Sequence, residues 1–324
     1  MREAGALSAP RGWVPALAAA LALASAGCGS EETGAARQAT DTGTVTGSLA
    51  RIESRGTLLL PTDLAYPPAS FRVKGAERGA GTRCAENQFT AQQVDGYDIA
   101  VGEAVAAALS VEPCFVTPSW TALLAGNWAD RWDVAFSSIG ITRARMQDLY
   151  FTQPYYATPE RFYVRKGGPI DRAEQLEGAR IGVCTGCFAD LYLQHELDIP
   201  GAEVKYQLDE PVIVGYDVER SGLDDVGTGK LAAFLCQETA GDQAIGEGLR
   251  LKGLDPAAYE AFIGGALDRS RGTAVRPFFD RLNAILERLH GDGTLKRLSL
   301  KYFEHDYATR AARFDLATIE QTVR

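Results

Sequence analysis

Two adjacent serines followed by an arginine could bind a small organic anion. Residues 133–136 read as a short buried strand, Ser137 and Ser138 follow it directly, and Arg145 comes after a short predicted turn. Hydroxyl and backbone N–H groups can hold one carboxylate oxygen, and a guanidinium can bind both oxygens in a fork. Because ligands of open α/β sheets sit at the carboxyl ends of strands, this cluster predicts a binding site for a small carboxylate.

An extended motif surrounds this cluster. Ile141 and Thr142 stand between the serines and the arginine, and Phe-Thr-Gln-Pro-Tyr-Tyr follows at residues 151–156. Together with Asp133, these residues resemble the polar amino-acid family of bacterial extracellular solute-binding proteins, family 3, the extracytoplasmic receptors of ABC importers. The resemblance extends over about residues 56–307. It implies a protein that binds a small solute in an inter-lobe cleft and is not an enzyme.

The resemblance also implies the fold class, an α/β, two-lobed periplasmic-binding-protein fold of type II. Each lobe is then a mixed sheet flanked by helices, and two hinge strands, expected at 162–166 and 262–267, join the lobes. A ligand that contacts both lobes would favour a closed form. The expected boundaries are 51–165 and 268–312 for a discontinuous lobe 1, 166–267 for lobe 2, and 313–324 for a C-terminal tail.

Three positions in lobe 1 border the ligand if the resemblance holds. Asp63 and Tyr66 lie in a segment similar to the family's opening motif, Thr-Asp-x-x-Tyr-Pro-Pro. Asp63 could meet a cationic part of the ligand, and Tyr66 could stack on its flat part or be a core aromatic. Trp120 falls where the family places a second aromatic, which would sandwich the ligand with Tyr66. Gly140 stands where a Ser or Thr often helps to hold the carboxylate.

Lobe 2 departs from the family at two places. Gly186 and Cys187 precede a helix expected at 189–197, whose first backbone N–H groups could hold a carboxylate. Cys187 replaces the family's Thr, so the hydroxyl is missing. Gln237 aligns with the family's Asp that binds an α-amino group. Either the neighbouring Glu238 supplies that carboxylate through a shifted register, or no such group is bound.

The N-terminus resembles a bacterial lipoprotein signal. Arg2 and Arg11 precede the apolar stretch 13–24, and a small-residue run then ends at Cys28. Residues 1–28 are expected to be this signal, with Cys28 lipidated and the protein anchored at the periplasmic or cell-surface side of a membrane. An ordinary cleaved signal peptide is the alternative. Residues 29–50 contain few large apolar side chains and are expected to form a flexible tether.

Five cysteines follow Cys28, and export would permit disulfides. Two disulfides are favoured: one would join a long loop to a nearby strand, and the other would close a tight local bridge. In a competing pairing, the remaining cysteine bonds to one member of the second pair. The favoured pairs are Cys84–Cys114 and Cys184–Cys187, and the remaining cysteine is Cys236. The histidines show no ligand-like spacing with these cysteines, so neither a metal nor a cofactor is expected. A thioredoxin-like redox role for the second pair is a weaker interpretation.

Composition excludes some classes of partner. The chain has 324 residues and a net charge of -9, without a Lys/Arg-rich run, which argues against a nucleic-acid partner. The expected partners are an amino acid or other small organic acid or amine, a transporter permease, and the membrane through the lipid anchor, with the protein a monomer. A cyclohexadienyl-dehydratase-like lyase and a ligand-sensing partner of a signalling receptor are the alternatives.

Hydrophobic periodicity adds two local predictions. The spacing predicts a helix over 273–290 with one apolar face, and residues 202–206 read as a strand. The residues of the apolar face are Phe278, Leu282, Ile285, Leu286 and Leu289.

Overall fold

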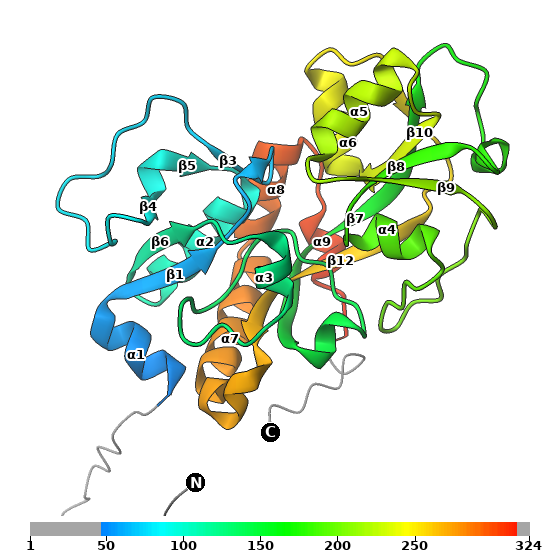
Figure 1. The fold of residues 1–324 in the computed structure, drawn as a ribbon. Helices are drawn as coiled ribbons and strands as arrows, with labels where there is room; N and C mark the ends of the chain where they lie inside the picture. The colour runs from blue at the N-terminus through cyan, green and yellow to red at the C-terminus, as the bar shows by residue number, and fades with distance from the viewer. Residues whose placement is uncertain (1–46, 316–324) are drawn as a thin grey trace, which may run out of the picture. The chain divides into compact units, whose positions relative to one another are not determined.

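The computed structural model describes residues 47–315, which belong to one compact unit, Thr44–Arg324 (Figure 1). The predicted signal with its lipidated Cys28, most of the predicted tether, and residues 316–324 of the predicted tail lie outside the described residues. Among residues 47–315, none of the helices combines the length and the hydropathy that a bilayer span requires.

Within residues 47–315 the strands are, in chain order, β1 (Thr57–Pro61), β2 (Ala65–Tyr66), β3 (Ser70–Arg72), β4 (Phe89–Thr90), β5 (Val94–Asp95), β6 (Glu112–Val116), β7 (Leu149–Arg165), β8 (Arg180–Cys184), β9 (Val212–Tyr216), β10 (Ala233–Gln237), β11 (Leu251–Gly253) and β12 (Tyr259–Asp268). The helices are α1 (Ser48–Arg55), α2 (Tyr97–Ala108), α3 (Trp120–Leu124), α4 (Phe188–Leu193), α5 (Glu219–Thr228), α6 (Glu238–Gly246), α7 (Arg276–Gly291), α8 (Thr294–Phe303) and α9 (Ala308–Ala311). Short 3-10 helices are η1 (Ala91–Gln93), η2 (Arg145–Gln147), η3 (Ala173–Leu176) and η4 (Arg269–Val275).

Three sheets carry these strands. The first has the order β1-β6-β4, with β1 and β6 parallel, and the second is the small sheet β2-β3-β5. The third has the order β11-β7-β10-β8-β9, and β12 pairs with β7 off this path. In Figure 1, β7 and β12 run from the region of β1 and β6 toward β8, β9 and β10.

The long strand β7 changes partners along its length. Its first part pairs with β12, from Leu149 opposite Asp268 to Glu160 opposite Tyr259. Its last part, from Glu160 to Arg165, pairs with β10 and β11. The predicted second hinge strand, 262–267, therefore pairs with residues 150–157. These residues come earlier in the chain than the predicted first hinge strand, 162–166. The lobe boundaries themselves remain predictions.

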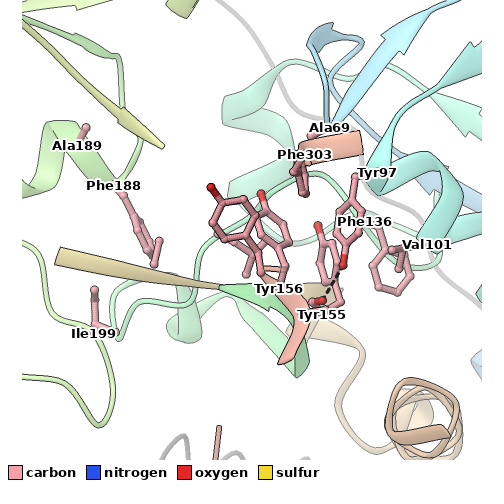
Figure 2. Close-up of a cluster of buried hydrophobic side chains, with 14 of the residues drawn as sticks. Ala69, Tyr97, Val101, Phe136, Tyr155, Tyr156, Phe188, Ala189, Ile199 and Phe303 are labelled. Carbon is pink, nitrogen blue, oxygen red and sulfur yellow. Dashed lines mark hydrogen bonds between the residues drawn. The ribbon is translucent and has the colours of Figure 1, made fainter. Parts of the chain in front are cut away.

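A buried aromatic cluster lies where β7 passes α2 and α8. Figure 2 shows Tyr97, Phe136, Tyr155, Tyr156 and Phe303 gathered together, and the Tyr97 hydroxyl donates to the backbone carbonyl of Tyr155 at 2.9 Å. Tyr97 is stacked on Tyr155 at 5.9 Å between ring centroids and meets Tyr156 edge to face at 5.3 Å. Such pairs stabilise a core by about 0.5–1.5 kcal/mol beyond their buried area.

Several local predictions are confirmed. The predicted apolar face of 273–290 is the buried face of α7, which begins with Pro277 in its first turn, a position that suits proline. The buried residues of α7 are Phe278, Leu282, Ile285, Leu286 and Leu289. Both favoured disulfides, Cys84–Cys114 and Cys184–Cys187, are present, and Cys236 is a buried free cysteine, so the competing pairing is wrong.

Three local predictions are wrong. Residues 133–136 are buried but form only an isolated bridge, between Ala135 and Ala266. Asp133 instead bonds to Leu59 of β1: its backbone N–H donates to the Leu59 carbonyl at 3.0 Å, and its carboxylate accepts the Leu59 N–H at 2.8 Å. Residues 202–206 are irregular, and the strand is β9, which pairs with β8. The predicted tether ends earlier than expected, since α1 begins at Ser48 and buries Ile52.

The predicted C-terminal tail also begins inside the packed structure. The ring of Phe314 lies 4.8 Å from the ring of Phe262, between centroids, and the Gln153 side chain donates to the Phe314 carbonyl at 3.3 Å. Residue 314 is therefore part of the fold rather than of a tail.

Candidate ligand-binding site

A cavity of about 470 Å³ opens between the elements that carry the predicted site residues. This volume lies within the roughly 300–1,000 Å³ typical of small-molecule sites. Most of the predicted residues line it: Asp63, Tyr66, Trp120, Ser137, Ser138, Gly140, Arg145, Cys187 and Gln237. The structure thus brings together residues from β2, α3, η2, the start of α4 and β10, although their role in binding stays a prediction.

Arg145 is buried on the wall of this cavity and keeps most of its donors free. It is 8% exposed, and the Thr142 hydroxyl accepts its backbone N–H at 3.0 Å. Nη1 donates to the Gly140 carbonyl at 3.0 Å and Nη2 to the Gly186 carbonyl at 3.2 Å. A guanidinium has five N–H donors, so three remain for an anion. Burial lowers the pKa of Arg145 to about 10, which still leaves it charged at neutral pH.

Aromatic rings flank the Arg145 guanidinium. Its central carbon lies 5.6 Å from the ring centroid of Trp120 and 4.9 Å from that of Phe188. A Cβ at Gly140 would lie 2.2 Å from the Phe188 ring. The absence of a side chain at Gly140 therefore has a steric reason, since Phe188 occupies the space that a Ser or Thr would need.

Ser138 belongs to a buried hydrogen-bond network. Its Oγ donates to Asp98 Oδ2 at 2.7 Å and lies 2.8 Å from the Tyr156 hydroxyl, which lies 2.9 Å from Gln237 Oε1. The Tyr155 hydroxyl donates to Asp98 Oδ1 at 2.7 Å and accepts the Ser138 N–H at 3.1 Å. Burial raises the pKa of Asp98 to about 7. The Ser138 hydroxyl is therefore engaged by the protein.

Ser137 and Asp63 are linked at the cavity edge. The Ser137 Oγ accepts the Asp63 backbone N–H at 3.1 Å, which leaves the Ser137 hydroxyl proton available. Asp63 is exposed, and its Oδ1 accepts the Ala65 N–H at 2.8 Å. One carboxylate oxygen of Asp63 therefore remains to face a cation.

Two predicted contributions from the second half of the chain need correction. The Gly186 N–H donates to Asp190 Oδ2 at 2.8 Å and the Cys187 N–H to the Cys184 carbonyl at 3.3 Å, so these donors are already used. Gly186 itself does not line the cavity, and it contributes a carbonyl to Arg145 instead.

Glu238 is the second correction, because it does not line the cavity. Its Oε2 forms an ion pair with Arg161, and its Oε1 accepts the Tyr307 hydroxyl at 2.8 Å. Glu238 begins α6, one residue beyond the strand that carries Gln237, and its side chain points toward β7 and the C-terminal segment. A shifted register that would bring Glu238 to the ligand is therefore wrong.

Sequence reasoning missed two carboxyl groups in the cavity. Glu160 on β7 is 2% exposed, and Glu219 begins α5. Burial raises the pKa of Glu160 well above its ordinary value, and burial together with the charge of Asp63 raises the pKa of Glu219 to about 8. A single glutamate inside the aromatic and apolar strand β7 is the signal that could have identified Glu160.

One group of potential metal ligands occurs in the described part of the chain. The sulfurs of Cys184 and Cys187 and a carboxylate oxygen of Glu219 all lie within 4.8 Å of one another. Since the two sulfurs are joined in a disulfide, they are not available as thiolate ligands. In this state the group does not offer a metal site.

Curated relatives cover most of this chain. The chain is 27% identical over 260 residues to the L-arginine-binding protein of Pseudomonas aeruginosa, and the alignment covers 77% of this chain and 93% of that protein. It is 26% identical over 267 residues to the L-cystine-binding protein TcyJ of Escherichia coli, and this alignment covers 80% of this chain and 87% of that protein.

Solved structures show the same fold. A mutant of ArgBP from T. maritima superposes with a TM-score of 0.64 at 19% identity, covering 80% of this chain and 100% of that chain. An ancestral amino acid-binding protein, a precursor of cyclohexadienyl dehydratase, has a TM-score of 0.63 at 22% identity and covers 79% and 99%. The predicted α/β periplasmic-binding-protein fold is therefore confirmed. The family model of bacterial extracellular solute-binding proteins, family 3, matches residues 79–305, and the chain belongs to this family.

Proposed function

We propose that this protein is the extracytoplasmic substrate-binding component of an ABC importer, and that its cavity binds an amino acid or related small carboxylate. The observation that carries the proposal is the buried Arg145 guanidinium, which lines the cavity and forms no ion pair within residues 47–315. A buried charge without a counter-ion is costly, so an anionic ligand would complete this environment.

The relatives support an amino-acid ligand. The similar proteins named above bind L-arginine and L-cystine, both of which carry a carboxylate beside an ammonium group. In this chain the carboxylate would take the free donors of Arg145, with the Ser137 hydroxyl as a further donor. Trp120 and Tyr66 would cover flat or aliphatic parts of the ligand.

Binding would require no chemical step. A ligand that contacts residues before β7 and residues of α4, α5 and β10 favours the conformation in which these elements approach one another. That conformation would present a surface to a membrane permease. Lipidation at Cys28 would hold the receptor near its transporter, with the residues between Cys28 and α1 as the tether.

The experiment is recovery of the natural ligand. Small molecules released from the purified protein by denaturation would be identified by mass spectrometry, and the refolded protein titrated with them by calorimetry. We expect an unchanged amino acid or small carboxylate that binds with one-to-one stoichiometry. Failure of amino acids and small carboxylates to bind would overturn the proposal.

An enzyme on the same scaffold is a second candidate. Glu160 and Glu219 are cavity carboxyls with raised pKa values, as a general acid would need, and one similar structure is a precursor of cyclohexadienyl dehydratase. Turnover of prephenate or arogenate would support the enzyme, whereas recovery of bound ligand unchanged supports the receptor. A role as sensor for a signalling receptor would appear as capture of a kinase rather than a permease.

A further inference from the structure

The carboxyl group of Glu160 is buried in the cavity wall without a partner. Its side chain is 2% exposed and lines the cavity. Within residues 47–315 it forms neither a hydrogen bond nor an ion pair, and its surroundings act on it only through burial and the charges of Glu219 and Arg145. The carboxyl lines the cavity with no partner from the chain, which leaves it for a group that enters from outside.

Glu219 approaches the same space from another element. It is the first residue of α5 and lines the cavity, and its Oε2 is buried without a hydrogen-bond partner. Glu219 is the nearby charge that most raises the pKa of Glu160. The two carboxyls, from β7 and α5, therefore repel each other when both are charged. A cation bound near both would offset this repulsion and the cost of burying the charges.

The Gln237 side chain cannot accept a hydrogen bond from an ammonium group of the ligand. Its Oε1 lies 2.9 Å from the Tyr156 hydroxyl and 3.4 Å from the Thr239 hydroxyl, so the amide presents its N–H₂ donor elsewhere. Glu160 stands directly opposite Gln237 in the antiparallel pair of β7 and β10. Directly opposed residues project to the same face of a sheet, so Glu160 places a carboxylate beside the neutral amide.

We propose that Glu160 and Glu219 form a cation subsite, which holds one ammonium or guanidinium group of the ligand. This inference rests on the proposed function, in which Arg145 takes the carboxylate of the same ligand. Arg145 on one side and the two carboxyls on the other match a zwitterion, and a ligand with only one of the two charges leaves one side of the cavity uncompensated.

Binding a cation at this subsite is linked to proton release. Burial raises the pKa of both carboxyls and favours their protonated forms, and the pKa of Glu219, about 8, keeps this group largely protonated near neutral pH without a ligand. The carboxylates must ionise to receive a cation, and the proton passes to solvent. Affinity therefore rises with pH across the neutral range. The titratable groups that interact electrostatically with one or both carboxyls are Asp63, Tyr66, Arg145, Tyr156, Cys236 and Tyr259.

The test measures affinity for L-arginine, L-lysine and succinate by calorimetry in the full chain. Glu160→Gln and Glu219→Gln keep the shape of the side chain and remove its charge, and Glu203→Gln makes the same change at an exposed residue outside the cavity. We expect each cavity variant to weaken binding of the amino acid at least tenfold, with Glu203→Gln within twofold of wild type. Titration in two buffers of different ionisation enthalpy should show proton release in wild type and less of it in Glu219→Gln.

Each outcome decides between the two proposals. If wild type binds an amino acid and both cavity variants retain that affinity within twofold, the cation subsite is wrong and the receptor function stands. If wild type binds succinate but neither amino acid, the subsite is likewise overturned. If none of the probes binds and no amino acid or small carboxylate is recovered from the protein, the receptor function itself fails.

Discussion

Arg145 donates a hydrogen bond from Nη2 to the backbone carbonyl of Gly186, 3.2 Å away and 41 residues later in the chain. The same guanidinium donates to the carbonyl of Gly140 from Nη1. One side chain therefore joins the segment before β7 to the loop between β8 and α4. A ligand carboxylate at Arg145 would bind at this junction, which couples ligand binding to the approach of the two segments.

Replacement of Arg145 by Ala should abolish measurable binding. Truncating one partner of a buried charge pair costs about 2–5 kcal/mol, so affinity should fall at least about 30-fold. The two carbonyls that lose their donor should lower the free energy of unfolding by about 1–3 kcal/mol, so the protein should still fold. Arg143→Ala, which removes an exposed arginine two residues away, is the matched control. Calorimetry and urea unfolding give the two readouts, and unchanged affinity in Arg145→Ala would remove the carboxylate assignment.

Gly140→Ala should disturb the packing of Phe188. The new Cβ would lie 2.2–2.6 Å from three ring atoms of Phe188, and such overpacking costs about 1–3 kcal/mol. Because Phe188 also flanks the Arg145 guanidinium, we expect weaker ligand binding as well as a lower melting temperature.

The matched experiment for Gly140 adds Phe188→Leu, alone and in the double variant. The smaller side chain should accommodate the new methyl group, so the double variant should be less destabilised than the sum of the single changes. Full stability and affinity in Gly140→Ala would show that the ring moves aside without consequence. Additive effects would show that the cost of Gly140→Ala does not arise from contact with Phe188.

The order of motifs is sufficient to predict much of the cavity. Asp63, Trp120 and Arg145 fall at fixed places in the chain order of this fold, and the structure puts all three on one cavity. The face of α7 follows from a 3.6-residue period that a packed helix must show. These features depend on local sequence or on the order of elements.

The features that sequence reasoning missed depend on long-range pairing. Glu160 meets Gln237 through the register of β7 with β10, which no local pattern encodes. The N–H of Gly186 looks available in sequence, but the side chain of Asp190 reaches back to it. For β9 a local signal existed, the β-branched run Val212–Ile213–Val214, but its half-exposed edge position gives no alternation of apolar and polar residues.

Asp98→Asn should flatten the pH dependence of stability. Burial raises the pKa of Asp98 to about 7, so the native state holds this proton more tightly than the unfolded chain does. The stabilisation is complete below the pKa of an unfolded aspartate and is lost as the pH rises through about 7. Asn mimics the protonated acid: its oxygen still accepts from the Tyr155 hydroxyl, and its N–H₂ group donates to Ser138 Oγ, which reverses the bond that Ser138 donates to the ionised Asp98.

Urea unfolding at about pH 5 and about pH 8 measures the effect of Asp98→Asn. The loss of unfolding free energy between these pH values should be smaller in the variant than in wild type by roughly 3 kcal/mol. Asp209→Asn, an exposed aspartate, is the control and should retain the wild-type difference. Equal pH dependence in wild type and Asp98→Asn would mean that Asp98 is ionised throughout.

Removal of the Cys84–Cys114 disulfide should destabilise the protein without affecting binding. Its sequence separation is 30, and closing a loop of this length stabilises the native state by about 3–4 kcal/mol in the chain-entropy model. Neither cysteine lines the cavity. In Cys84→Ala/Cys114→Ala we expect a lower urea midpoint and ligand affinity within twofold of wild type. Loss of affinity at a temperature where the variant is folded would contradict this separation.

Removal of the Cys184–Cys187 disulfide should have the opposite balance of effects. Its separation is only 3, so the same model gives a smaller contribution of about 2 kcal/mol. Both cysteines line the cavity, and the loop between them carries the Gly186 carbonyl that Arg145 contacts. A loop released from this bridge can move that carbonyl away from Arg145.

Ligand affinity in Cys184→Ser/Cys187→Ser should therefore fall by a factor of about ten or more, while the urea midpoint changes less than in the Cys84–Cys114 variant. A dithiol reductant that lowers the affinity of wild type but not of the Ser variant would identify this disulfide as the cause, and wild-type affinity in the Ser variant would show that the loop keeps its position without it.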